Sequence, residues 1–151
     1  MKNIFLIFIC LFFLIACKTE SKISSKQVFD YNTWNKFNSL ELVASIPEAA
    51  KYQTKVRFEY TSNYEYTDLK IQYELISPDG ESKLSYVNIP VIDKNGKNLG
   101  KKNGEFMVVE HIISKADNFN TKGEYKIIID NQMPKFDTEN IVSLEVILEE
   151  L

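Results

Sequence analysis

The stretch KVRFEYTS, residues 55–62, alternates between apolar and polar side chains. In an extended chain Val56, Phe58 and Tyr60 share one face, while the charged residues between them share the other. One apolar face with period two is typical of a half-buried antiparallel strand. The same pattern returns in LKIQYELI (69–76), YKIIID (125–130) and IVSLEVILEE (141–150). The repeated pattern predicts an all-β protein.

Turn sequences separate these stretches. Residues 77–80 are Ser-Pro-Asp-Gly, in which proline presets φ and glycine accepts a positive φ. Asn95-Gly96 is a strong hairpin signal. About eight strands are expected, at residues 27–31, 39–47, 54–62, 68–77, 83–92, 104–113, 124–132 and 141–149. Short strands divided by turns predict one antiparallel β-sandwich domain over residues 27–151. Residues 47–52, PEAAKY, are a candidate for one helical turn.

The chain begins with a hydrophobic segment that is too short to span a membrane. Lys2 precedes twelve apolar residues at positions 4–15, whereas a transmembrane helix needs about 20. This arrangement predicts a cleaved signal peptide over residues 1–16. Residues 14–17, LIAC, resemble the bacterial lipobox, so Cys17 is the expected lipid attachment site, carrying palmitate-type acyl chains. The alternative is an ordinary secretory signal that ends in cysteine.

Residues 17–26 are predicted to comprise the lipidated cysteine and a flexible tether. KTESKISSK, residues 18–26, carries a single apolar side chain, and nine residues span about 30 Å at most. Removing residues 1–16 leaves 17 basic and 21 acidic residues, a net charge of −4, and no cysteine beyond Cys17. An acidic chain of this kind gives no sign of nucleic-acid binding. Because Cys17 is its one remaining cysteine, the mature chain cannot form an internal disulfide.

No catalytic or metal-binding pattern is present. The single histidine, His111, lies in an expected strand beside Val109 and Ile113, where a structural role is favoured. One histidine and one lipidated cysteine do not make a zinc site. The acidic loop that starts at Asp93 lacks the glycine and glutamate positions of a calcium loop and contains four lysines. No metal, no cofactor and no enzymatic activity are therefore expected.

Two aromatic features remain. Tyr60, Tyr64 and Tyr66 form a cluster that is expected either to pack in the core or at a strand edge, or to stack on sugars. Trp34 is expected in the core, with an interface hot spot as the alternative.

Several segments together resemble the GldH family of gliding-motility lipoproteins. They are the lipobox cysteine, VFD (28–30) with Trp34, SPDG (77–80), IPVIDKNGKNLGKKNG (89–104), GEY (123–125) with QM (132–133), and residues 141–148. The most specific part is the D-x-x-G-x-x-L-G run, residues 93–100. The sequence departs from the family at Asn98, where tryptophan is frequent, and at Asn140, where glycine is frequent. The second change is mild because asparagine tolerates the left-handed conformation.

The resemblance implies a non-enzymatic, membrane-anchored lipoprotein of the gliding-motility machinery and its linked secretion apparatus. Its partners would be the membrane, through the lipid, and other gliding or secretion proteins of the envelope. Lys18 after the cysteine gives no aspartate-type retention signal, which favours the outer membrane. The expected contact surface is the loop with Lys94, Lys97, Lys101 and Lys102. The alternative function is a surface glycan-binding lipoprotein that uses the tyrosine cluster with Tyr64 and Tyr66.

Overall fold

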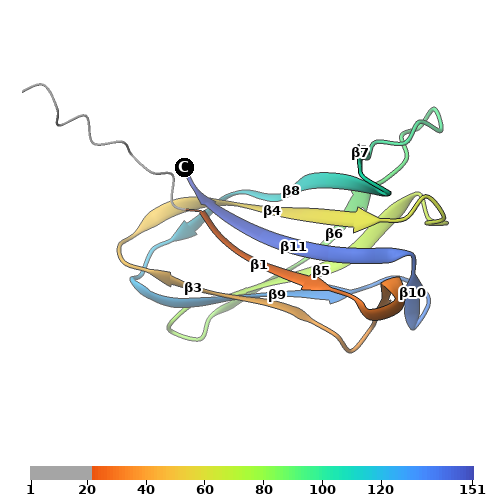
Figure 1. Cartoon of the computed structure of the whole chain (residues 1–151). Coiled ribbons are helices and arrows are strands. Elements are labelled where there is room, and N and C mark those ends of the chain that lie inside the picture. Colours follow the sequence, from red (N-terminus) through yellow and green to blue (C-terminus); the bar gives the residue numbers. More distant parts are fainter. Residues whose placement is uncertain (1–21) are drawn as a thin grey trace, which may run out of the picture.

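The chain folds as two antiparallel β-sheets packed face to face (Figure 1). This computed structural model describes residues 22–151. The signal peptide, Cys17 and residues 18–21 lie outside the described residues. One sheet has the order β1-β11-β4-β8-β7 and the other the order β3-β9-β5-β6. A two-stranded ribbon, β10-β2, lies at one end.

The bounds of the elements follow the chain order. They are β1 Lys22–Val28, the 3-10 turn η2 Asp30–Asn32, β2 Thr33–Asn35, β3 Leu40–Ile46, β4 Ala50–Tyr60, β5 Asp68–Ile76, β6 Ser82–Pro90, β7 Lys101–Asn103, β8 Phe106–Phe119, β9 Gly123–Asn131, β10 Asp137–Glu139 and β11 Ile141–Glu150. The all-β sandwich is confirmed. Eight of these strands have seven residues or more, and β2, β7 and β10 have three each.

Two sequence predictions are wrong at the beginning of the domain. Lys22–Val28 form β1, so residues 22–26 belong to the sheet and not to the tether, and the strand expected at 27–31 ends at Val28. β1 pairs with β11 along its whole length, from Lys22 opposite Glu149 to Val28 opposite Ser143. Main-chain pairing forms this strand although Ile23 is its one apolar residue before Val28. In addition, Ala50–Tyr52, expected in a helical turn, begin β4.

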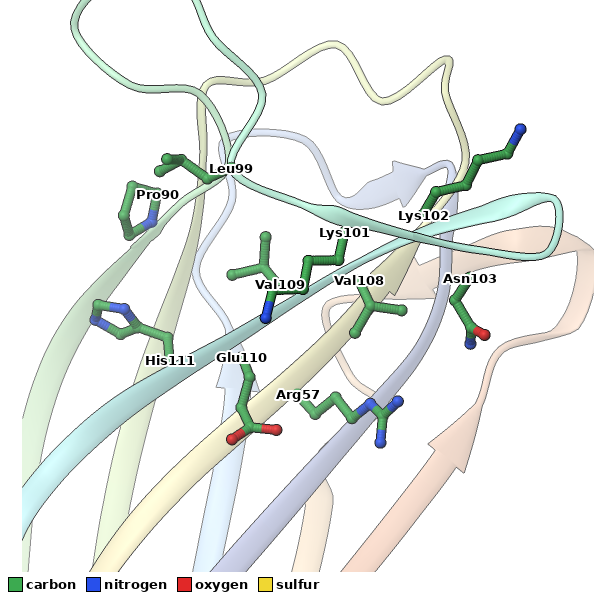
Figure 2. A pocket seen from close by; sticks show the side chains of 10 residues that line it. All are labelled: Arg57, Pro90, Leu99, Lys101, Lys102, Asn103, Val108, Val109, Glu110 and His111. Atoms are coloured by element: carbon green, nitrogen blue, oxygen red, sulfur yellow. The ribbon is translucent and has the colours of Figure 1, made fainter.

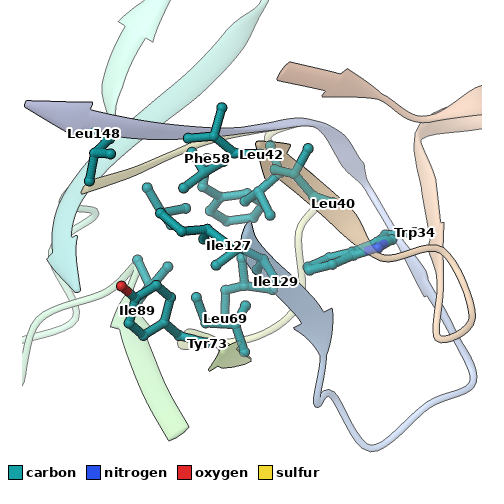
Figure 3. Close-up of a cluster of buried hydrophobic side chains, with 14 of the residues drawn as sticks. Trp34, Leu40, Leu42, Phe58, Leu69, Tyr73, Ile89, Ile127, Ile129 and Leu148 are labelled. Atoms are coloured by element: carbon teal, nitrogen blue, oxygen red, sulfur yellow. The ribbon is translucent and has the colours of Figure 1, made fainter. Parts of the chain in front are cut away.

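The core lies between the sheets and is built from the alternating positions. In β3 every second residue is buried, and in β9 and β5 the inward side chains are also buried. Phe58 of β4 faces Ile127 and Ile129 of β9 across the sandwich (Figure 3). Trp34 is fully buried and stacks on Phe29 at 5.3 Å between ring centroids, which confirms its core position.

Among residues 22–151, no buried side-chain nitrogen or oxygen lacks a hydrogen-bond partner. The Tyr73 hydroxyl in β5 donates to Asp117 in β8 at 3.0 Å and lies 3.4 Å from the Thr54 hydroxyl in β4. Lys83 of β6 reaches the same carboxylate at 3.0 Å. Asp117 is 2% exposed, so these donors offset the cost of burying its charge. The network ties both sheets together at the β6–β8 side.

Asn140 takes the left-handed conformation before β11, with φ of 68°. The left-handed conformation that the sequence argument allowed for Asn140 is therefore observed. The Asn140 side-chain and main-chain oxygens accept hydrogen bonds from the Thr61 hydroxyl and amide at 2.9 and 3.1 Å. These bonds join the end of β4 to the start of β11.

Candidate functional site

The loop of residues 93–104, called the lysine loop here, is organised by Asp93. One Asp93 carboxylate oxygen accepts the main-chain N–H groups of Asn95 and Lys97 at 2.8 and 2.9 Å. Gly96 completes the turn with a φ of 81°. Asp93 therefore works as a turn-forming residue. Among residues 22–151 no group of three or more His, Cys, Asp or Glu could hold a metal ion.

Asn98 and Gly100 fasten this loop to the sandwich. The Asn98 side-chain oxygen accepts both the Tyr60 hydroxyl at 2.8 Å and the Gly100 N–H at 2.7 Å. Gly100 lies against the Tyr60 ring: a Cβ there would lie 3.1 Å from Cζ and closer still to the hydroxyl oxygen. The glycine and the asparagine are thus required for close contact with a buried tyrosine.

The structure places the lysine loop at the end of the sandwich opposite Lys22, called the far end here. Val28, the last residue of β1, pairs near the start of β11, where Ile141 lies opposite Tyr60. Figure 1 shows β7 and β10 at this end and the C-terminus at the other. The seven residues of β1 span about 23 Å along the strand, which separates the Lys22 end of the sandwich from the far end.

The four predicted contact lysines are brought together on this loop and are exposed. Lys94 and Lys97 flank the turn, and Lys101 and Lys102 lie in β7, which pairs with the start of β8. None of the four forms an ion pair within residues 22–151. Their positive charge therefore faces solvent on an otherwise acidic chain.

A cleft of about 640 Å³ lies beside β7, and no sequence pattern indicated it. We call it the edge cleft. It is lined by Arg57, Pro90, Leu99, Lys101, Lys102, Asn103, Val108, Val109, Glu110 and His111 (Figure 2). Figure 2 shows that His111 and Glu110 point to opposite sides of β8, so the cleft includes both sides of this strand. The strand pattern placed Arg57 on the outer face but could not identify its neighbours from other strands.

His111 lies on the inner side of the edge cleft with Val109, as its spacing predicted. Burial lowers the pKa of this imidazole, because the charged form loses hydration. Among the described residues no carboxylate forms an ion pair with the ring. A neutral, half-buried histidine fits a structural role.

The tyrosine cluster is internal, which corrects the idea that it offers an exposed sugar-stacking surface. Tyr60 and Tyr64 are buried and pack with Phe58 at centroid distances of 4.9 and 5.3 Å. The Tyr64 hydroxyl donates to the main-chain oxygen of Asp68 at 2.9 Å, and burial raises the pKa of this phenol. Tyr66 is half-buried beside Tyr64. The cluster supports the core and positions Asn98.

Exposed aromatic side chains occur instead on and near the β10–β2 ribbon. Phe37 and Phe136 are 80% and 51% exposed and meet edge to face at 4.8 Å. Tyr31, in η2, is 99% exposed and has a positive φ. These residues carry no sequence signal because they lie outside the alternating strands.

The fold and its surface define a β-sandwich with an exposed cationic loop at its far end. The family model of the GldH lipoprotein matches residues 22–147. The chain therefore belongs to the GldH lipoprotein family, and it is a gliding-motility-associated lipoprotein. The family indicates a lipid-anchored protein of the cell envelope. In the described part of the chain, no helix is long and apolar enough to cross a bilayer.

Curated proteins give no significant match to this chain. Solved structures match at low identity. The mosquito-larvicidal Cry4Aa toxin from Bacillus thuringiensis has a TM-score of 0.48 and 12% identity, over 87% of this chain and 23% of that chain. A CocE/NonD family hydrolase from Staphylococcus aureus has a TM-score of 0.47 and 10% identity, over 87% and 34%.

A family 35 carbohydrate binding module from Clostridium thermocellum has a TM-score of 0.43 and 16% identity, over 84% of this chain and 90% of that chain. This chain spans about a third of the hydrolase and about a quarter of the toxin. Because all three TM-scores lie below 0.5, no functional argument rests on them.

Proposed function

We propose that this protein is a non-enzymatic assembly or binding component of the gliding-motility machinery and its linked secretion apparatus, held on the outer membrane by a lipid on Cys17. The observation that carries the proposal is the family match over residues 22–147, which includes the whole lysine loop. The protein would act by binding other envelope proteins.

The position of β1 sets the geometry of this role. Because β1 begins at Lys22, four residues separate Cys17 from the sheet. The distance from Cys17 to Lys22 is at most about 18 Å. A lipid on Cys17 would therefore hold the near end of the sandwich close to the bilayer. The lysine loop, at the far end, would face away from that membrane.

The lysine loop is the proposed contact surface for an envelope partner. Four exposed lysines without ion pairs in the described chain attract acidic surfaces, and such attraction speeds association. The Asn98 bonds hold the loop in one position on Tyr60, which lowers the entropy lost on binding. A fixed, charged loop is well suited to recognise a partner.

Charge reversal tests this surface. In a strain that lacks the native gene, a copy in which Lys94, Lys97, Lys101 and Lys102 are all replaced by glutamate should fail to restore gliding. Its abundance in the membrane fraction should equal that of the wild type, because all four side chains are exposed. The control replaces Lys22 and Lys51 by glutamate at other exposed sites. Normal gliding of the four-lysine variant would rule the surface out.

A further inference from the structure

Strand β8 has an open edge that begins where β7 ends. β7 covers β8 only from Phe106 to Val108, whereas β8 continues to Phe119. β7 is the last strand of its sheet within residues 22–151. The main-chain groups of β8 that follow Val108 on this side therefore have no strand partner, which is the condition for pairing with another chain.

The edge cleft lies at this point and continues the line of β7 (Figure 2). On the inner side of β8 it is lined by Val109 and His111, with Pro90 and Leu99 opposite. Leu99 is 44% exposed. On the outer side the lining changes to charged residues, chiefly Arg57 and Lys101.

The two sides differ in the chemistry that they would accept. Side chains of a strand alternate between the two faces of its sheet, so a strand placed beside β8 would send alternate residues to the apolar side and to the cationic side. Arg57 makes no ion pair within the described residues, and Lys101 makes none. Glu110 is the acidic residue of the cleft lining; it lies 3.9 Å from Lys55 and is partly compensated. Glu145 lies opposite Arg57 in the sheet register but does not line the cleft.

We propose that the edge cleft binds an extended segment of a partner polypeptide, in which apolar residues alternate with aspartate or glutamate, as an added strand antiparallel to β8. Main-chain hydrogen bonds around Glu110 would give affinity, and the alternating sides would give specificity. This proposal rests on the function proposed above, because it specifies the chemistry of the envelope partner named there. The peptide would bind beside the lysine loop.

The added strand would be short. The β4–β8 register shifts between Thr54 and Lys55, opposite residues 112–114 of β8, and bulges of this kind bend an edge. Further along β8, the Lys83 side chain of β6 reaches over to Asp117, with Nζ 3.0 Å from the carboxylate, and covers the β8 edge there. The part of the β8 edge that can pair with an added strand is therefore residues 109–113, next to the cleft.

The test uses the full lipidated chain in detergent micelles and the synthetic probe acetyl-Val-Asp-Val-Asp-Val-Asp-amide. Hydrogen exchange, read by mass spectrometry, should show slower exchange in residues 109–113 when the probe is present at up to about 1 mM. Two control peptides carry lysine in place of aspartate, or the same residues grouped as Asp-Asp-Asp-Val-Val-Val. Neither should slow exchange.

Variants separate backbone pairing from charge. Glu110→Pro removes the N–H next to the last β7 pair and should abolish protection. Arg57→Gln with Lys101→Gln should weaken binding at least about tenfold, and this pair serves if the proline variant fails to fold. Lys122→Gln, at an exposed site outside both the cleft and the lysine loop, should leave binding unchanged.

Five results would overturn the proposal. The first four are no protection by the alternating probe, equal protection by a control peptide, equal binding of the double glutamine variant, and protection that rises with protein concentration when no probe is present. The fourth result would mean that a second copy occupies the edge. Binding of polygalacturonate in place of the peptide would assign the cleft to a glycan and likewise overturn it. Peptide binding does not depend on gliding, so this test can fail while the motility assignment stands.

Discussion

Replacing Gly100 by alanine should detach the lysine loop from the sandwich. The new Cβ would lie 3.1 Å from Tyr60 Cζ and nearer still to its hydroxyl oxygen, inside van der Waals contact. Tyr60 cannot swing away, because its ring is 1% exposed and packs between Phe58 and Tyr64. The loop must therefore move outward and break the 2.8 Å hydrogen bond between Tyr60 and Asn98.

The expected cost has two parts. Overpacking at a tight contact costs about 1–3 kcal/mol, and the lost hydrogen bond costs about 1 kcal/mol more. The free energy of unfolding should fall by about 2–4 kcal/mol, which lowers the melting temperature by roughly 8–16 °C for a domain of this size.

Urea denaturation of the purified protein measures this cost in a double-mutant cycle with Tyr60→Phe, which removes the hydroxyl. In the phenylalanine background, Gly100→Ala should be less costly by at least about 1 kcal/mol, because the clash is relieved. The matched control is Gly96→Ala, at a φ of 81° with open space around it. Its cost of about 1–2 kcal/mol is purely conformational and should not depend on Tyr60. Additive costs of Gly100→Ala and Tyr60→Phe, within about 0.5 kcal/mol, would refute the contact.

Three further predictions concern the core, the histidine and the anchor. Trp34→Ala should lower the free energy of unfolding by about 3–5 kcal/mol in chemical denaturation, because the indole is fully buried; a loss below about 1 kcal/mol would contradict its core role. Burial lowers the pKa of His111 in the folded protein, so as the pH falls the unfolded chain binds a proton at this histidine first. The contribution of His111 to stability is therefore complete above about pH 6.5 and is lost as the pH falls through the native pKa. His111→Gln should flatten this part of the stability–pH curve, and identical curves would contradict the shift. Cys17→Ser should move the protein from the membrane to the soluble fraction, and unchanged membrane retention would remove the lipid anchor from the proposal.

Alternation predicted the fold well because β3, β4, β5 and β9 each bury one face. Val56, Phe58 and Tyr60 lie inward as their spacing required, and Asn140 takes the expected backbone conformation. β1 could not be found in this way. Its sequence is polar, and what holds it is main-chain pairing with β11, which side-chain patterns do not report.

The site was predictable only in part. The lysines follow from local sequence, since a turn between strands is exposed. The edge cleft does not, because Arg57, Pro90, Leu99 and His111 come from separate segments that only the sheet order brings together. Tyr60 and Tyr64 follow the core interpretation of the tyrosine cluster: both are buried and pack onto Phe58 although Tyr64 lies in a polar stretch, and only the sugar-stacking alternative fails.

Single-cell gliding speed in a strain from which the gene is deleted shows whether this protein serves gliding. We expect the deletion to stop gliding over surfaces and a copy of the full chain to restore wild-type speed. Deletion cells that glide at wild-type speed would contradict it.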